Sequence, residues 1–220
     1  MSERKKFFPK ETPMLRENGT QFSGIEKRIY SNPDNPKVIA AKIRDFEPEL
    51  TNSDSQEVVA LKQRDPDFGR LRSVRDVKAS FYLTKIFHFL FPKNIPDIYA
   101  AYTNPAGFIR KKVNLGVDHQ VFENVDLEEK FARKEYRDLI VEEALQNLIK
   151  IKLELLPQMI KTGLVIEDYN DEGRAANYGR DSTGNPIYIE ELRPWKSQVY
   201  GIPLFPQFDY QKLKQSIIDK

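Results

Sequence analysis

The chain combines an ordinary composition with a nearly neutral charge, which narrows the classes of protein to which it can belong. It has 220 residues, 40% of them hydrophobic and 31% charged, and is long enough to bury a substantial core. Its 35 basic and 33 acidic residues give a formal net charge of +2, so bulk charge indicates neither nucleic acid nor a membrane surface as a partner. The absence of cysteine excludes disulfides and thiolate metal sites.

The sequence shows no sign of secretion or of membrane insertion. Its first nine residues are rich in charge and lack the apolar run of a signal peptide. No window reaches the roughly 18 consecutive apolar residues of a membrane span. We therefore expect a soluble cytoplasmic protein with no membrane partner.

The first fifth of the chain predicts a flexible arm and two strands. Residues 1–18 are charged and polar and contain two prolines, which is typical of a poorly ordered segment. Residues 27–30 have strand character, and a turn rich in Asn and Pro separates them from an apolar run at 37–43. This run carries Lys42, and a lysine near the end of a strand often extends its ammonium group to solvent.

Residues 72–90 predict a helix. Valine, phenylalanine, tyrosine, isoleucine and leucine recur there at helical spacing, and the pattern stops before Pro92. The helix contains no glutamate, and its only acid is Asp76, near the start. His88 is interpreted as a packing residue, because no second metal ligand lies nearby in the sequence.

Two further strands are expected at 94–102 and 107–113, joined by a short turn. Three basic residues, Arg110, Lys111 and Lys112, lie at the end of the second strand. Charges of this kind commonly protect the edge of a sheet from aggregation. We therefore do not take them as evidence of a nucleic-acid partner.

The second half of the chain predicts a long helix over 126–162. Its apolar stripe is broad, which indicates a helix buried on more than one side. Pro157 is expected to kink this helix or to mark its last turn, and Gly163 is a natural stop. A final helix is expected over 210–218.

The most informative stretch is 163–192. Residues 181–186 form a turn, because Gly184 can adopt a positive φ and the Asp and Asn side chains bond their own backbone. Alternating residues on either side predict a short hairpin, with Asn177 at its entrance and Glu190 at its exit. A side-chain amide and a carboxylate could then converge, although a surface hairpin without chemistry is the alternative.

The segment from Asn177 to Glu190, NYGRDSTGNPIYIE, resembles part of the protein-kinase-like phosphotransferases. In that family the catalytic-loop Asn and the metal-binding Asp are thirteen positions apart, as these two residues are (190 − 177 = 13). The resemblance implies Mg²⁺ ligands at Asn177 and Glu190, a catalytic acid at Glu172 and a basic catalytic residue at Arg174. Asp168 is the rival acid if the loop carries an insertion. Glu replaces the family's Asp at both acidic positions, and Glu-Leu follows in place of Phe-Gly.

The N-terminal half fits the same resemblance. It implies that Lys42 is the strand lysine that contacts nucleotide phosphates, that Gly24 belongs to the glycine loop, and that Asn114 lies near the hinge where an adenine stacks. Lys62 is the alternative lysine, although its surroundings also predict the start of a helix. The full G-x-G-x-x-G pattern is missing, and the helix lacks the family's Glu partner for the lysine.

The resemblance implies an α+β protein-kinase-like fold with two lobes. Residues 19–114 would form an antiparallel-sheet lobe with one helix, and residues 115–220 a reduced helical lobe that contains the hairpin. It further implies ATP and Mg²⁺ as cofactors and phosphate transfer to an unknown hydroxyl acceptor, a small molecule or a protein. Two alternatives remain open: an inactive kinase-like domain that binds nucleotide or protein, and an unrelated α+β interaction domain.

Overall fold

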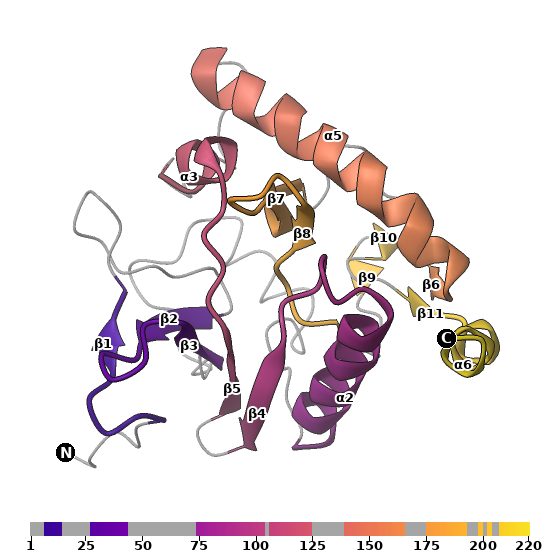
Figure 1. Cartoon of the computed structure of the whole chain (residues 1–220), viewed down its shortest axis with the longest axis horizontal. Helices are drawn as coiled ribbons and strands as arrows, with labels where there is room; N and C mark the ends of the chain where they lie inside the picture. Colours follow the sequence, from indigo (N-terminus) through magenta and orange to yellow (C-terminus); the bar gives the residue numbers. More distant parts are fainter. Residues whose placement is uncertain are drawn as a thin grey trace.

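The structure is a computed structural model that describes residues 7–14, 27–43, 74–103, 106–124, 139–165, 175–192, 198–199, 202–203 and 207–220. Figure 1 shows how its elements are arranged. The strands are β1 (Thr12–Pro13), β2 (Lys27–Ser31), β3 (Val38–Ile43), β4 (Ile98–Thr103), β5 (Ala106–Lys111), β6 (Leu164–Val165), β7 (Tyr178–Arg180), β8 (Pro186–Tyr188), β9 (Gln198–Val199), β10 (Ile202–Pro203) and β11 (Gln207–Phe208). The helices are α2 (Val74–Leu90), α3 (Val117–Asn124), α5 (Leu139–Lys161) and α6 (Tyr210–Ile218), with a 3₁₀ turn η2 (Ala175–Asn177).

Five strands form one antiparallel sheet in the order β1-β2-β3-β5-β4, so the expected strands and the α+β class are confirmed. Alternate residues of a strand point to opposite faces. On β3, Ala41 and Ile43 point to one face, whereas Ala40 and Lys42 point to the other. The pairing of Ala41 with Phe108 and of Lys42 with Gly107 extends these two faces across β5.

Helix α2 covers the first of these faces, and we call this the helix side of the sheet. Its Val77 packs with Ile43, Ile98 and Phe108 in a buried cluster. The helix begins in the structure at Val74 and ends at Leu90, as its apolar spacing predicts. The side chain of Asp76 lies outside the described residues, as do the first two residues of the expected helix.

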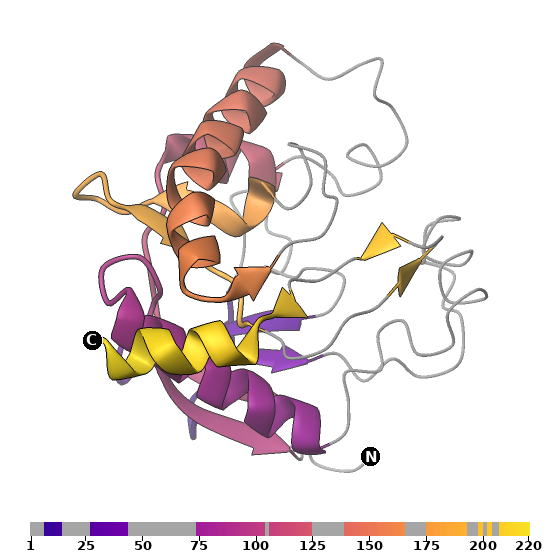
Figure 2. The same cartoon turned by 90° about the vertical axis from the view of Figure 1, so that its right-hand side faces the viewer.

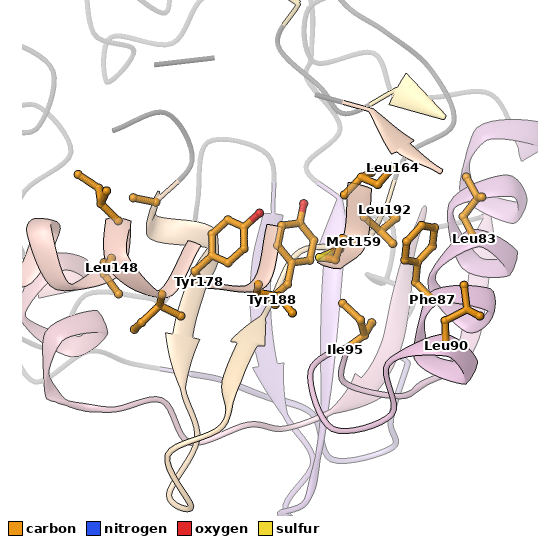
Figure 3. Close-up of a cluster of buried hydrophobic side chains, with 14 of the residues drawn as sticks. Leu83, Phe87, Leu90, Ile95, Leu148, Met159, Leu164, Tyr178, Tyr188 and Leu192 are labelled. Atoms are coloured by element: carbon orange, nitrogen blue, oxygen red, sulfur yellow. The ribbon is translucent and has the colours of Figure 1, made fainter. Parts of the chain in front are cut away.

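The main core lies between α2, α5 and the β7–β8 hairpin, and Figure 3 shows it in close-up. Its larger members include Leu83, Phe87, Leu90, Ile95, Leu145, Leu148, Leu155, Met159, Leu164, Tyr178, Tyr188, Leu192 and Leu213. They come from both sides of residue 114, where the sequence predicts a lobe boundary. In Figure 2, helix α6 lies alongside α2, and the Lys220 ammonium donates to the Leu90 carbonyl at 3.1 Å. One core therefore joins the two halves of the chain.

The long helix of the second half is α5, which is described from Leu139 onward and confirms the later part of that prediction. It buries Leu148, Leu155 and Met159 along one stripe. Pro157 lies inside the helix, one turn before its end, where the missing N–H group removes one bond of the helix. Among the described helices, none is long and apolar enough to cross a membrane.

Gly163 lies between α5 and β6 and contacts the start of α6, and its replacement should be more costly than that of Gly184. Both have positive φ, 107° and 83°. At Gly163 an added Cβ would lie 2.7 Å from the Asp209 backbone oxygen and 2.7 Å from the Leu213 nitrogen. At Gly184 it would meet no atom of the described part of the chain within 4 Å. Gly184→Ala should cost the left-handed penalty of about 1–2 kcal/mol. Gly163→Ala should cost more, because backbone must also move. Urea unfolding of both variants checks this, and equal losses would contradict it.

Candidate functional site

The structure describes four of the sequence-predicted site residues: Lys42, Asn114, Asn177 and Glu190. The other predictions fall outside the described residues: Gly24, Lys62, Asp168, Glu172 and Arg174. The predicted roles of these five residues in catalysis or nucleotide binding therefore stay predictions.

Asn177 and Glu190 lie at the same open end of the β7–β8 hairpin. The amide of Ile189 donates to the Asn177 carbonyl at 2.8 Å, and this bond holds the start of β7 beside the end of β8. The 3₁₀ turn before β7 is held from α3, where the His119 Nε2 lies 3.0 Å from the Ala176 carbonyl. A ring nitrogen that faces a carbonyl must carry its hydrogen, so His119 is a donor here. The backbone at this end of the hairpin is therefore held by a bond within the hairpin and by a contact from α3.

The other end of the hairpin is a turn organised by Asp181. Its carboxylate accepts from the Thr183 hydroxyl at 2.7 Å and from the backbone amides of Thr183 and Asn185 at 2.9 and 3.0 Å. Burial raises the pKa of this carboxyl, but these bonds and that from the Asn185 side chain outweigh it, so the pKa lies below its ordinary value of 3.8. The bonds to the charged form therefore favour this turn at neutral pH.

Neighbouring elements hold the hairpin against the sheet layer. The Asn94 side chain donates to the Pro186 carbonyl at 2.8 Å, and the Tyr188 amide donates to the Asn94 carbonyl at 2.9 Å. The Gly116 amide donates to the Arg180 carbonyl at 2.9 Å. The Tyr178 and Tyr188 rings meet edge to face at 5.1 Å inside the core (Figure 3). The contacts from Asn94 and Gly116 therefore tie the hairpin to two segments that precede α3 in the chain.

The exit of the hairpin is bonded to helix α2. The Ser80 hydroxyl donates to the Leu192 carbonyl at 2.7 Å, and the Leu192 amide donates to the Thr84 hydroxyl at 3.1 Å. Ser80 and Thr84 are buried and lie one helical turn apart, so both hydroxyls reach the same residue, Leu192. They satisfy backbone groups that would otherwise be buried without partners. The segment that carries Glu190 is therefore fixed two residues beyond it.

A buried ion pair between Arg110 and Glu191 lies beside this exit. The Arg110 Nη1 donates to the Glu191 Oε1 at 2.8 Å, and the two side chains are 12% and 1% exposed. The Arg110 Nε is buried and has no hydrogen-bond partner among the described residues. The sequence-based interpretation of Arg110 as an edge charge is wrong, because β5 lies between β3 and β4 in the sheet. The one sign of this pair in the sequence is that the charged Glu191 directly follows Glu190, the predicted metal ligand.

Lys42 has a carboxylate partner, and that partner belongs to the N-terminal segment. Its ammonium forms an ion pair with Glu11, and the two side chains are 12% and 6% exposed. Residues 7–14 thus lie against the sheet, although the sequence predicts a flexible arm over 1–18. Phe8 is buried in a small cluster with Tyr30 and Ala40. A buried aromatic ring and an ion pair hold this segment in place. Its sequence has no repeating apolar pattern, and such a pattern is what would predict an ordered segment.

Lys42 and the exit of the hairpin contact different faces of the sheet. Lys42 points to the face opposite α2, which we call the outer side. Arg110, which binds Glu191, pairs with Ile39 and points to the helix side. Along β3, Lys42 lies three residues, about 10 Å, from Ile39, the residue that pairs with Arg110. The expected convergence of Lys42 with Asn177 and Glu190 therefore gains no support. The backbone bond at the hairpin end places Asn177 opposite Ile189, next to Glu190 in the chain, and the convergence of the Asn177 and Glu190 side chains stays a prediction.

The structure also describes Asn114 and His88, two further residues singled out from the sequence. Asn114 is exposed in the segment between β5 and α3. The His88 Nδ1 lies 2.6 Å from the Ile95 carbonyl, which fits a packing role. Within the described part of the chain, no group of three or more His, Asp or Glu side chains could hold a metal ion.

Comparisons with known proteins assign no family to this arrangement. No family model and no curated protein matches the chain. Among solved structures, the complex of Rv3197 with erythromycin from Mycobacterium tuberculosis is similar at 14% identity and a TM-score of 0.42. The match covers 82% of this chain and 44% of that one, so the chain spans less than half of that protein's length. A likeness of this size does not confirm the kinase-like resemblance.

Proposed function

We propose that the protein is a phosphotransferase-like binder of ATP and Mg²⁺, and that it binds them at the open end of the β7–β8 hairpin. The observation that carries the proposal is the bond from the Ile189 amide to the Asn177 carbonyl, which sets Asn177 beside the segment of Glu190. The amide oxygen and the carboxylate are the hard oxygen ligands that Mg²⁺ prefers. Magnesium, when bound, would neutralise charge on the transferred phosphoryl group.

The order of elements supports the same proposal. Among the described elements, three strands, a helix, two more strands, a short helix, a long helix and a hairpin follow one another, an order that resembles that of the kinase-like phosphotransferases. Two protein ligands suit Mg²⁺, because it usually keeps several waters and takes further oxygens from phosphates. On this proposal, Glu172 or Asp168 would orient the acceptor hydroxyl and Arg174 would neutralise charge beside it.

The chain's own residues would hold the site rigid rather than perform bond-breaking steps. The Leu192 bonds to Ser80 and Thr84 and the pair between Arg110 and Glu191 limit the movement of the hairpin exit. Rigid placement matters because a shift of about 1 Å in a catalytic group can cost about 100-fold in rate. Arg110 lies on the helix side, where it is a nearer cation to this exit than Lys42.

A second function, nucleotide or protein binding without catalysis, is favoured by one observation. Lys42 is paired with Glu11 on the outer side of the sheet, which removes the strand lysine from the phosphate contact that the family makes. Metal-dependent turnover of ATP separates the two functions. Turnover above that of a Glu190→Gln variant would support the enzyme.

Wild-type protein should gain thermal stability when ATP and Mg²⁺ are added together. Binding to the native state stabilises it by about 2.7 kcal/mol when the ligand is at about 100 times its Kd. Glu190→Gln should abolish the magnesium-dependent part of the shift, and Glu190→Asp should keep much of it, because the oxygen ligand keeps its charge. Glu143→Gln, an exposed change on α5, is the matched control. An unchanged wild-type melting temperature would contradict the proposal.

A further inference from the structure

The N-terminal segment 7–14, which we call the strap, lies on the outer side of the sheet. The Glu11 carboxylate accepts from the Lys42 ammonium through Oε1 and from the Phe7 amide at 2.9 Å through Oε2. This carboxylate therefore binds a buried cation and closes the strap on itself at the same time. The pair is well shielded, since neither side chain is more than 12% exposed.

Aromatic rings complete the surroundings of Lys42. Its ammonium lies 4.6 Å from the centroid of Tyr30 and 5.2 Å from that of Phe7, both within the range of a cation–π contact. Phe7 in turn stacks on Tyr102 of β4, with centroids 4.6 Å apart and planes at 24°. The strap thus supplies an anion for Lys42 and a flat ring for Tyr102.

Gly107 provides the room for the Phe7 ring. It lies opposite Lys42 on β5, and a Cβ there would stand 2.7 Å from the Phe7 Cε2 atom. A carbon so close would push the ring off Tyr102. The sheet surface beneath the strap is therefore shaped to receive a planar ring next to a buried ammonium.

A buried ion pair is weak evidence of stability, because apolar residues of similar volume often serve as well or better. Its best-attested use is to specify or switch a structure. The strap itself has few backbone bonds to the sheet: β1 contributes only Thr12 and Pro13, paired with Ser31 and Tyr30 of β2. Opening it would break this short ladder, the bond from the Met14 amide to the Ile29 carbonyl, the ion pair with Lys42 and the ring stack on Tyr102, and it would expose Phe8.

We propose that the strap is an internal competitor that occupies a nucleotide-phosphate site on the outer side of the sheet. Glu11 stands where a phosphate would contact Lys42, and the Phe7 ring stands where a base would stack on Tyr102. This site lies on the opposite face from the contacts of the hairpin exit and needs no metal, so it goes beyond the function proposed above. Ligand affinity at such a site falls in proportion to the fraction of molecules with an open strap.

The test compares full-length variants by two measurements in EDTA, which silences the magnesium-dependent site. The first is the Kd for ATP by calorimetry, with inorganic phosphate as a second probe. The second is the rate of Lys42 acylation by an N-hydroxysuccinimide ester, read by mass spectrometry, with the exposed Lys37 as the internal standard. Lys10→Gln is the matched control, because it removes an exposed pair with Asp34 from the same strap.

Glu11→Gln should bind ATP about tenfold more tightly than wild type and acylate Lys42 about tenfold faster. Lys10→Gln should change neither value, and Glu11→Gln with Lys42→Met should lose ATP binding. Tight binding of phosphate alone would show that the anion, rather than the ring, is recognised, and would overturn the nucleotide assignment.

Equal rates of Lys42 acylation in wild type and Glu11→Gln would overturn the proposal that the strap competes for Lys42. Faster acylation without ATP binding would overturn the nucleotide assignment, and the magnesium-dependent shift of wild type would still decide the proposed function separately. If Glu11→Gln fails to fold, Phe7→Ala replaces it in the calorimetry. It frees Tyr102 while the ion pair remains, so ATP should bind more tightly than to wild type and Lys42 should acylate at the wild-type rate; an unchanged ATP affinity would then overturn the proposal. Failure of both variants to fold would show a fixed part of the core and overturn the proposal.

Discussion

Replacement of Arg110 by Met should lower the free energy of unfolding by about 3–5 kcal/mol. The physical reason is that the Glu191 carboxylate, 1% exposed, would lose the cation that the structure gives it on β5. A carboxylate removed from water that loses a paired cation carries a large desolvation penalty. Methionine fills much of the volume of the arginine stem, so the loss would report charge rather than a cavity. Urea unfolding of wild type and variant measures it.

Two further variants make this result specific. Arg110→Met combined with Glu191→Leu should recover most of the lost stability, because replacing both members of a buried pair by apolar residues is often neutral or better. Arg180→Met is the matched single change, since Arg180 pairs with Glu154 at 2.5 Å but the two side chains are 40% and 45% exposed. It should cost no more than about 1 kcal/mol. Equal losses for Arg110→Met and Arg180→Met would contradict the burial argument.

The periodic elements could be predicted from the sequence because each carries its own signal. The strand at 37–43, the helix at 72–90 and the terminal helix at 210–218 all appear at or close to their expected bounds. The hairpin also follows its turn chemistry, with Gly184 at positive φ and Asp181 bonded to the residues after it. In each case local residues decide the local structure.

Contacts between distant residues could not be predicted in the same way. Lys42 was assigned to a strand correctly, but nothing local specifies that Glu11, 31 positions earlier, lies against it. Arg110 and Glu191 are 81 positions apart, and each looks like a surface charge within a run of charges. The apolar pattern sets the face to which a residue points, whereas the partner on that face depends on the whole topology.

Helix α3 was missed for a related reason. It spans only Val117–Asn124, and its Val117 is 73% exposed, so it presents no apolar stripe of useful length. It is fixed instead by polar contacts, among them the Asn147 side chain of α5, which donates to the Asp118 carboxylate at 3.1 Å. A short helix held by tertiary bonds leaves little trace in the sequence.

Phe87→Ala should also lower the free energy of unfolding by about 3–5 kcal/mol, because it removes a fully buried ring and leaves a cavity. Phe87 is 0% exposed, and its ring centroid lies 6.3 Å from that of Phe91 and 5.9 Å from that of Phe208. Phe89→Ala, on the same helix but 53% exposed, is the matched control and should cost far less.

The same variant tests whether the chain unfolds as one unit. Phe87 belongs to a core whose members lie on both sides of residue 114, and Figure 3 shows its ring near Leu192. A cavity there weakens contacts made by both halves of the chain, so one cooperative transition should shift as a whole. Near-UV circular dichroism, which reports the packing of the buried Tyr178 and Tyr188 rings, and far-UV circular dichroism should then report the same midpoint. Two separated transitions, with only one moved by Phe87→Ala, would show instead that the halves are independent lobes.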